Sequence, residues 1–205
     1  MLDEHDQLAV IRGLRDGSRE AWTALYLGYS ADVWRYVGRL VGNHGNDVGD
    51  VVQETFLAAA RAAQQFDSSR GSLWSWLAGI AHHQAAVYWR HAAKPGRLRA
   101  LVEAGAVELR HWWDGSESAE GLLEKRELTD LVRGVLSDLS ADYATLLTAK
   151  YLDEQSLDDL ARQLGSSVEA IKSKLARARR EFRAKFESLT RESTPMVRES
   201  RDSKS

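Results

Sequence analysis

The chain has 205 residues, 43% of them hydrophobic, and a formal net charge of −2 at pH 7. It contains no cysteine, which excludes a disulfide framework, thiol catalysis and zinc sites built on cysteine. No apolar run approaches the roughly 18 residues that span a bilayer, and the acidic N-terminus lacks the basic-then-apolar order of a signal peptide. We therefore expect a cytoplasmic protein with no membrane insertion.

Long stretches rich in alanine, leucine, arginine and glutamate carry a hydrophobic period of about 3.6 residues. The alternating patterns typical of strands are missing from the sequence, which holds only two prolines. These features predict an all-α fold. We expect two small helical domains joined by a linker, the C-terminal one being a helix-turn-helix.

Residues 1–92 are predicted to form the N-terminal domain, a compact bundle of four helices. Ser18 follows Gly17 in a turn and is positioned to cap the next helix. Loops at 42–46 and 67–72 separate the later helices.

The helix that starts near Asp47 divides into an apolar face and a polar face. The polar face carries Asp50, Gln53 and Glu54, with the apolar Leu57 among them. An exposed apolar side chain within a polar face favours a contact surface for a partner. The alternative is an ordinary solvated face.

The fourth helix has apolar side chains on two sides. Trp76 and Ile80 share one side, and Trp74 and Ala78 share the other. Such a helix is either buried on both sides, or buried on one and used for binding on the other. We assign Trp76 to the core. Two roles stay open for Trp74: stacking on an unpaired base, or packing against the linker.

A proline-glycine pair opens a segment that breaks the helical pattern, and we assign residues 93–121 to a linker. It holds adjacent tryptophans, Trp112 and Trp113, whose contact stays open. Residues 122–188 are assigned to the C-terminal domain, and the polar residues 189–205 to a disordered tail.

Charge changes sign abruptly within the C-terminal domain. Residues 117–160 hold eleven acidic and four basic residues, a net charge of −7. Residues 161–185 hold eight basic and two acidic residues, a net charge of +6. This distribution indicates a positive face beside an acidic one. We hypothesise that in the free protein the acidic segment masks the basic helix.

The sequence SLDDLARQLG, which begins at Ser156, ends in a turn signal. Ser156 and Asp159 resemble a capping box, Gly165 supplies the permissive backbone of a tight turn, and Ser167 caps the next helix. A capped helix, a short glycine turn and a second helix form the helix-turn-helix pattern.

The second of these helices carries an apolar stripe at steps of four, three and four residues: Ile171, Leu175, Ala178 and Phe182. In a recognition helix one side anchors the helix and the other enters the major groove. The candidate DNA contacts are the capping serine and the polar residues opposite and beside the stripe: Ser167, Lys172, Ser173, Lys174, Arg177 and Arg180. A solvated helix with a basic face is the alternative.

Residues 139–182, LSADYATLLTAKYLDEQSLDDLARQLGSSVEAIKSKLARARREF, resemble the C-terminal promoter-binding domain of bacterial RNA polymerase sigma factors. DVVQETF at 50–56 and GSLWSWLAGIAHHQAAVYWRH at 71–91 resemble the conserved N-terminal domain of the same family. Two such domains with nothing else around them are similar to the extracytoplasmic-function (ECF) subfamily.

The resemblance implies a promoter-specificity subunit that binds core RNA polymerase and recognises and opens promoter DNA, with no enzymatic activity and no cofactor. Its partners would be core RNA polymerase and double-stranded and melted promoter DNA, and the family also admits an anti-sigma factor. Polymerase binding is implied for Asp50, Gln53, Glu54 and Leu57. Binding of the downstream promoter element is implied for Ser72, Trp74, His82, His83 and Arg90, although many relatives carry arginine and asparagine at the two histidine positions.

A stand-alone dimeric helix-turn-helix regulator is the alternative function. It leaves the DVVQETF segment without a role, and it requires DNA affinity without polymerase, which a net charge of −2 disfavours. An enzyme is disfavoured because the sequence has no Gly-rich phosphate loop and no nucleophile beside a base. A metal site is disfavoured because His82 and His83 are adjacent and do not share a helix face.

Overall fold

A computed structural model describes residues 4–42, 45–92 and 120–192, and every regular element in these ranges is helical. The all-α prediction is confirmed for this part of the chain. Trp112, Trp113 and the tail beyond residue 192 lie outside the described residues.

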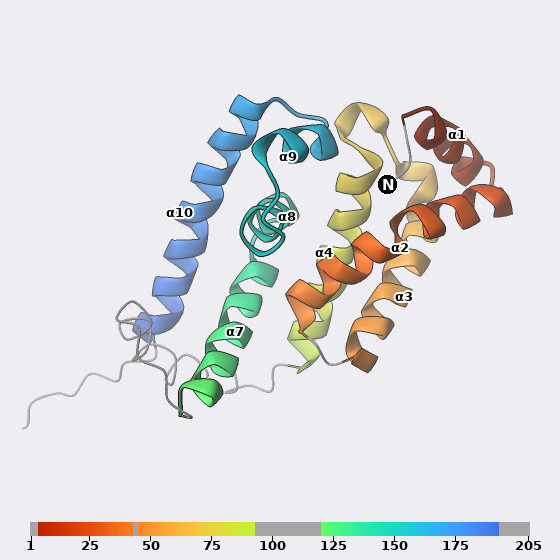
Figure 1. Cartoon of the computed structure of the whole chain (residues 1–205). Helices are drawn as coiled ribbons and strands as arrows, with labels where there is room; N and C mark the ends of the chain where they lie inside the picture. Colours follow the sequence, from red (N-terminus) through yellow and green to blue (C-terminus); the bar gives the residue numbers. More distant parts are fainter. Residues whose placement is uncertain (1–3, 43–44, 93–119, 193–205) are drawn as a thin grey trace, which may run out of the picture.

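The N-terminal domain consists of four helices and two short 3₁₀ turns (Figure 1). They are α1 (Glu4–Arg15), α2 (Arg19–Val41), α3 (Gly45–Ala62), η1 (Ala63–Gln65), η2 (Ser68–Arg70) and α4 (Leu73–Ala92). Ser18 caps α2 as predicted, because its hydroxyl accepts a hydrogen bond from the backbone N–H of Ala21 at 3.2 Å. The predicted loop at 42–46 is shorter than expected, since α3 already begins at Gly45.

The C-terminal domain consists of four helices and one turn of π-helix. They are α7 (Glu120–Asp138), α8 (Ala141–Leu147), the π turn η3 (Thr148–Leu152), α9 (Leu157–Leu164) and α10 (Val168–Glu192). Helices α9 and α10 are the predicted helix-turn-helix. Ser156 caps α9 through the N–H of Asp159 at 3.1 Å, and Ser167 accepts from the N–H of Ala170 at 3.2 Å at the start of α10.

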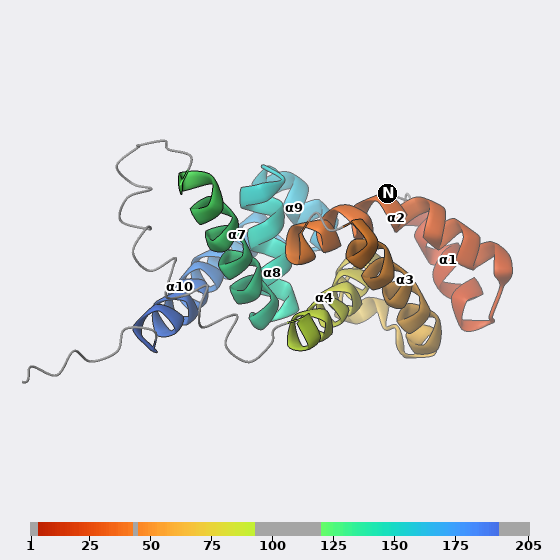
Figure 2. The same ribbon diagram turned by 90° about the horizontal axis from the view of Figure 1, so that it is seen from below.

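Helices α4 and α2 meet the C-terminal domain: α4 packs against α7, α8 and α9, and α2 packs against α7 and η3 (Figures 1 and 2). The buried apolar residues form one continuous cluster that includes members of both domains. At the end of α2, Gly42 has φ +100°, and a Cβ there would lie 2.9 Å from the guanidinium of Arg133 on α7. Because the guanidinium is the far end of a flexible side chain and can move, the positive φ, and not this contact, is what favours glycine at the end of α2.

Of the two tryptophans at the start of α4, Trp74 is the more deeply buried, and Trp76 packs at the edge of the core. Trp74 is 5% exposed, stacked on Tyr29 with ring centroids 6.4 Å apart and edge-on to Tyr36 at 6.2 Å. Trp76, assigned to the core from the sequence, is only half-buried and meets Phe66 edge-on at 5.2 Å. The Trp74 side of α4 is therefore the side that faces α2.

Two glycines offer a matched test of backbone strain. Gly165 ends α9 in the left-handed region at φ +61°, and an added Cβ would meet nothing within 4 Å; the same open space surrounds Gly79 inside α4. Gly165→Ala should lower the free energy of unfolding by about 1–2 kcal/mol, because only the backbone is strained. Gly79→Ala should leave it unchanged or raise it by up to about 1 kcal/mol.

Urea unfolding followed by circular dichroism compares the two variants. Equal effects of the two substitutions would contradict the assignment of Gly165 as the residue that permits the helix-turn-helix turn.

Candidate polymerase and nucleic-acid interfaces

The residues predicted to bind polymerase lie together on the outer side of α3. Asp50, Gln53, Glu54 and Leu57 are all exposed, Leu57 by 41%, and their spacing of three and four residues places them in one row. We call these four residues the α3 face. The opposite side of the helix carries the buried Val48, Val51, Val52, Thr55 and Ala59.

Exposed aromatic and apolar side chains of α2 adjoin the α3 face, and the sequence analysis missed them. Tyr26 is 52% exposed and its ring lies 5.0 Å from that of Phe56 on α3. Trp34, 50% exposed, lies against Gly49, and Leu27 is 74% exposed. Tyr26 and Trp34 are eight residues apart, which is a helical spacing that could have revealed this stripe.

Helix α10 has the division of faces that the sequence predicted. Ile171, Leu175 and Ala178 are at most 5% exposed and form its anchoring side. The opposite side is exposed, and we call its four polar residues the α10 face: Lys172, Ser173, Arg177 and Arg180. The α10 face is therefore accessible to solvent, and the buried side of the same helix anchors it on the domain.

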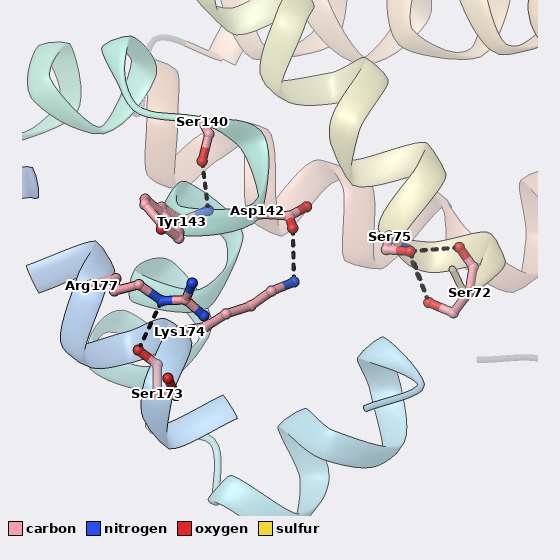
Figure 3. Close-up of polar contacts among 8 residues, drawn as sticks. All are labelled: Ser72, Ser75, Ser140, Asp142, Tyr143, Ser173, Lys174 and Arg177. Atoms are coloured by element: carbon pink, nitrogen blue, oxygen red, sulfur yellow. Dashed lines mark hydrogen bonds and ion pairs between the residues drawn. The ribbon is translucent and has the colours of Figure 1, made fainter. Parts of the chain in front are cut away.

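The basic residues that flank this side are held by acidic residues of α7 and α8. Lys174 Nζ reaches Asp142 Oδ2 at 2.8 Å, whereas Arg177 turns back along its own helix toward the carbonyl oxygen of Ser173 at 3.4 Å (Figure 3). Lys185 Nζ likewise lies 2.5 Å from Asp138 Oδ2. The masking hypothesis is wrong for the described acidic residues, because these pairs occupy the flanking lysines and leave the α10 face open.

Ser72 caps α4 and at the same time contacts the C-terminal domain. Its hydroxyl accepts from the backbone N–H of Ser75 at 3.1 Å, at the start of α4 (Figure 3). The same hydroxyl donates to the carbonyl oxygen of Gln163 in α9 at 2.9 Å. This contact joins residues 91 positions apart in the sequence.

His82 is 7% exposed and faces the C-terminal domain, with its Nε2 3.2 Å from the carbonyl oxygen of Leu136 on α7. Burial lowers the pKa of His82, and the charge of His83 adds to this; the Leu136 carbonyl and the carboxylate of Asp138 act in the opposite direction. His83 itself is exposed, as is Arg90.

We call Ser72, His82, His83 and Arg90 together the α4 face, of which His82 lies on the side toward α7 while His83 and Arg90 are exposed. Of the residues predicted to bind the downstream element, Trp74 is the one that does not join it. Both neighbouring rings of α2 cover Trp74, which leaves no free ring surface for a base in this arrangement.

The part of the chain that the structure describes offers neither a metal site nor a membrane-spanning helix. Among residues 4–42, 45–92 and 120–192, no three His, Cys, Asp or Glu side chains are grouped so that they could share a metal ion. None of the helices in these ranges has the length and apolar character needed to cross a membrane.

Comparisons with known proteins agree with the two domains. Residues 25–94 match the family model of sigma-70 region 2, and residues 129–182 match that of sigma-70 region 4. The ECF RNA polymerase sigma factor SigC of Mycobacterium tuberculosis is 34% identical over 180 residues, covering 86% of this chain and 89% of the relative. The ECF RNA polymerase sigma-E factor of Escherichia coli is 30% identical over 193 residues, covering 91% and 96%.

A solved structure, that of CnrH in complex with the cytosolic domain of CnrY, aligns with a TM-score of 0.47 and 20% identity over 89% of this chain and 98% of that chain. The family matches and the sequence relatives show that the chain belongs to the RNA polymerase sigma factors of the ECF type. It is a promoter-recognising subunit and not a stand-alone regulator.

The buried His82 predicts a pH dependence of stability. Because burial lowers its pKa, the neutral ring favours the folded chain at pH values above the ordinary histidine pKa of 6.5, and this contribution is lost as the pH falls below it. His82→Gln keeps a side-chain N–H for the Leu136 carbonyl but does not titrate. The unfolding free energy of the wild-type chain minus that of the variant should therefore decrease as the pH is lowered from 7.5 to 5.5.

Urea titrations of both chains at each pH measure this difference, and groups common to both cancel. A difference that stayed constant or grew on acidification would show that His82 is not buried in its neutral form.

Proposed function

We propose that core RNA polymerase docks on the α3 face and that the α10 face, with Ser167 and Lys174 beside it, binds the upstream promoter element. The α4 face captures the separated strand of the downstream element. The chain then acts without enzymatic chemistry of its own, in the cytoplasm where polymerase and promoters are found. The observation that carries this proposal is the separation of two exposed surfaces of different chemistry, one on each domain.

The α3 face suits a protein partner. The exposed Leu57 ends a row that begins with Asp50, Gln53 and Glu54, and the exposed rings of Tyr26 and Trp34 on α2 lie beside this row. Protein interfaces are enriched in aromatic residues and need an apolar centre with a polar rim. The acidic residues disfavour DNA at this surface and favour a basic protein surface.

The α10 face suits duplex DNA. Arg177 and Arg180 can neutralise phosphates or donate to guanine edges, and the small side chain of Ser173 lets the helix backbone approach. The chain as a whole carries a charge of −2. Because of this low net charge, the free chain should bind DNA weakly and depend on polymerase for a stable promoter complex.

Size-exclusion chromatography with purified core RNA polymerase tests the proposal as a whole. We expect stoichiometric co-elution, together with weak binding of promoter-free duplex DNA by the free chain. Absence of co-elution would overturn the assignment of the docking surface.

Reversing Arg177 and Arg180 to glutamate should weaken binding of the polymerase complex to promoter DNA by about a hundredfold or more, since each lost contact costs about 1–3 kcal/mol. Affinity for core polymerase should not change. The control is Arg12→Glu with Arg19→Glu, the same change of charge at exposed positions of α1 and α2. An equal loss of polymerase affinity in the α10 variant would contradict the division of surfaces.

Glu54→Lys should lower the affinity for core polymerase by about tenfold, because it places a positive charge in the centre of an acidic contact surface. Asp16→Lys makes the same change at an exposed position between α1 and α2 and should have little effect. Fluorescence titration with labelled chain measures both affinities. Equal effects of the two variants would place polymerase elsewhere on the molecule.

A further inference from the structure

Helix α10 is much longer than the part of it that can lie in a DNA groove. It runs for 25 residues, Val168–Glu192, which corresponds to about 37 Å at about 1.5 Å per residue. The major groove of duplex DNA is only about 12 Å wide. The match to sigma-70 region 4 ends at residue 182, so the last turns of α10 also lie beyond the family pattern. The proposed role of the α10 face therefore leaves these last turns unexplained.

Arg183 lies on the same side of α10 as the α10 face. At about 100° per residue, its direction falls between those of Lys172 and Ser173. Its side chain is exposed, like that of Arg180 one turn before it. Arg183 comes eleven residues after Lys172, which is about 16 Å along the helix axis. A helix whose first turns lie in the groove therefore carries Arg183 to the edge of the groove, where the duplex presents phosphates and not base edges.

Four arginines lie between residues 177 and 183, and the fold engages two of them. Arg179 Nη1 donates to the hydroxyl of Tyr151 at 3.2 Å, and Arg177 turns back toward a carbonyl oxygen of its own helix. No ion pair or hydrogen bond within the described residues engages the guanidinium of Arg180 or of Arg183. Both groups are therefore available to a ligand.

Effects within the helix disfavour this pair of cations. Neighbouring like charges on a helix repel each other and destabilise it. The helix dipole favours cations only in the last turn, and Arg183 lies nine residues before the end of α10. A ligand with negative charge compensates such a pair, and duplex DNA carries its charge on the phosphates.

The last turns of α10 are held on the domain by half-buried side chains. Lys185 pairs with Asp138 on α7, and the ring of Phe182 stacks on that of Phe186 with centroids 6.0 Å apart. Phe182 also packs against the buried core. Arg183 therefore projects from a fixed helix, which reduces the conformational entropy lost when it binds.

We propose that Arg183, together with Arg180, forms a phosphate-binding site for duplex DNA beside the upstream promoter element. The site binds the backbone without reading the base sequence, whereas selection of the sequence belongs to the first turns of α10. This inference rests on the proposed role of the α10 face and extends the DNA contact past the family match.

Removing the charge of Arg183 tests the site. The probe is a labelled duplex of mixed sequence, titrated with the full chain at several salt concentrations and followed by fluorescence anisotropy. Arg183→Gln should bind roughly fivefold more weakly at low salt, and the slope of log affinity against log salt should become shallower by about 1. Arg12→Gln removes the same charge at an exposed position of α1 and should keep the slope of the parent chain. Equal slopes in the two variants would overturn the site.

Adding a charge tests the site in the opposite direction. Ala184→Arg places a further cation beside Arg183, and Ala9→Arg places one at an exposed position of α1. The first should tighten binding of the same duplex and steepen the slope by about 1, because one more counterion is released. Equal affinities and slopes in these two variants would show that no phosphate lies near the last turns of α10. Circular dichroism of each variant checks that the helices are intact.

Selection of duplexes from a random library by the complex with core RNA polymerase separates this inference from the proposed function. Arg183→Gln should select the same sequence as the parent chain with a lower yield. Lys172→Ala with Ser173→Ala should select a different or less defined sequence. A changed sequence with Arg183→Gln would overturn the phosphate site, because Arg183 would then read bases. An unchanged sequence with the double variant would overturn reading by the α10 face, while the salt slopes still decide the Arg183 site.

Discussion

Helix α4 has to bury side chains on more than one side, and this requirement joins the two domains. Its Trp74 side packs among the rings of α2, while Ser72 and His82 meet backbone carbonyls of α9 and α7. A 20-residue helix shared in this way fixes the position of the helix-turn-helix relative to the N-terminal bundle. This arrangement covers Ser72 and His82 and leaves His83, Arg90 and the α3 and α10 faces exposed.

The distribution of charge within the C-terminal domain has a structural and a functional consequence. Asp142 and Asp138 pair with Lys174 and Lys185, which lie on α10 beside the α10 face. The buried Ile171, Leu175 and Ala178 anchor the helix. Because these pairs lie to the side, Arg177 and Arg180 stay exposed. The acidic residues therefore leave the α10 face open, and the proposed function assigns stable promoter binding to the complex with polymerase because the overall charge is low.

Features set by neighbouring residues could be predicted from the sequence. The caps at Ser18 and Ser156 and the left-handed turn at Gly165 depend on local backbone geometry, so residue type and spacing were sufficient. The deeper burial of Trp74 than of Trp76 could not be predicted, because a helix that is apolar on two sides fits either packing. The covering of Ser72 depends on a partner 91 positions away, which no local pattern encodes.

Hydrogen exchange of the chain, free and bound to core RNA polymerase without DNA, tests the proposal that docking uses the α3 face and leaves the α10 face open. It predicts slower amide exchange at residues 50–57 in the complex, because this segment becomes covered, and unchanged exchange at residues 172–180. Unchanged exchange at 50–57 with slower exchange at 172–180 would contradict the account.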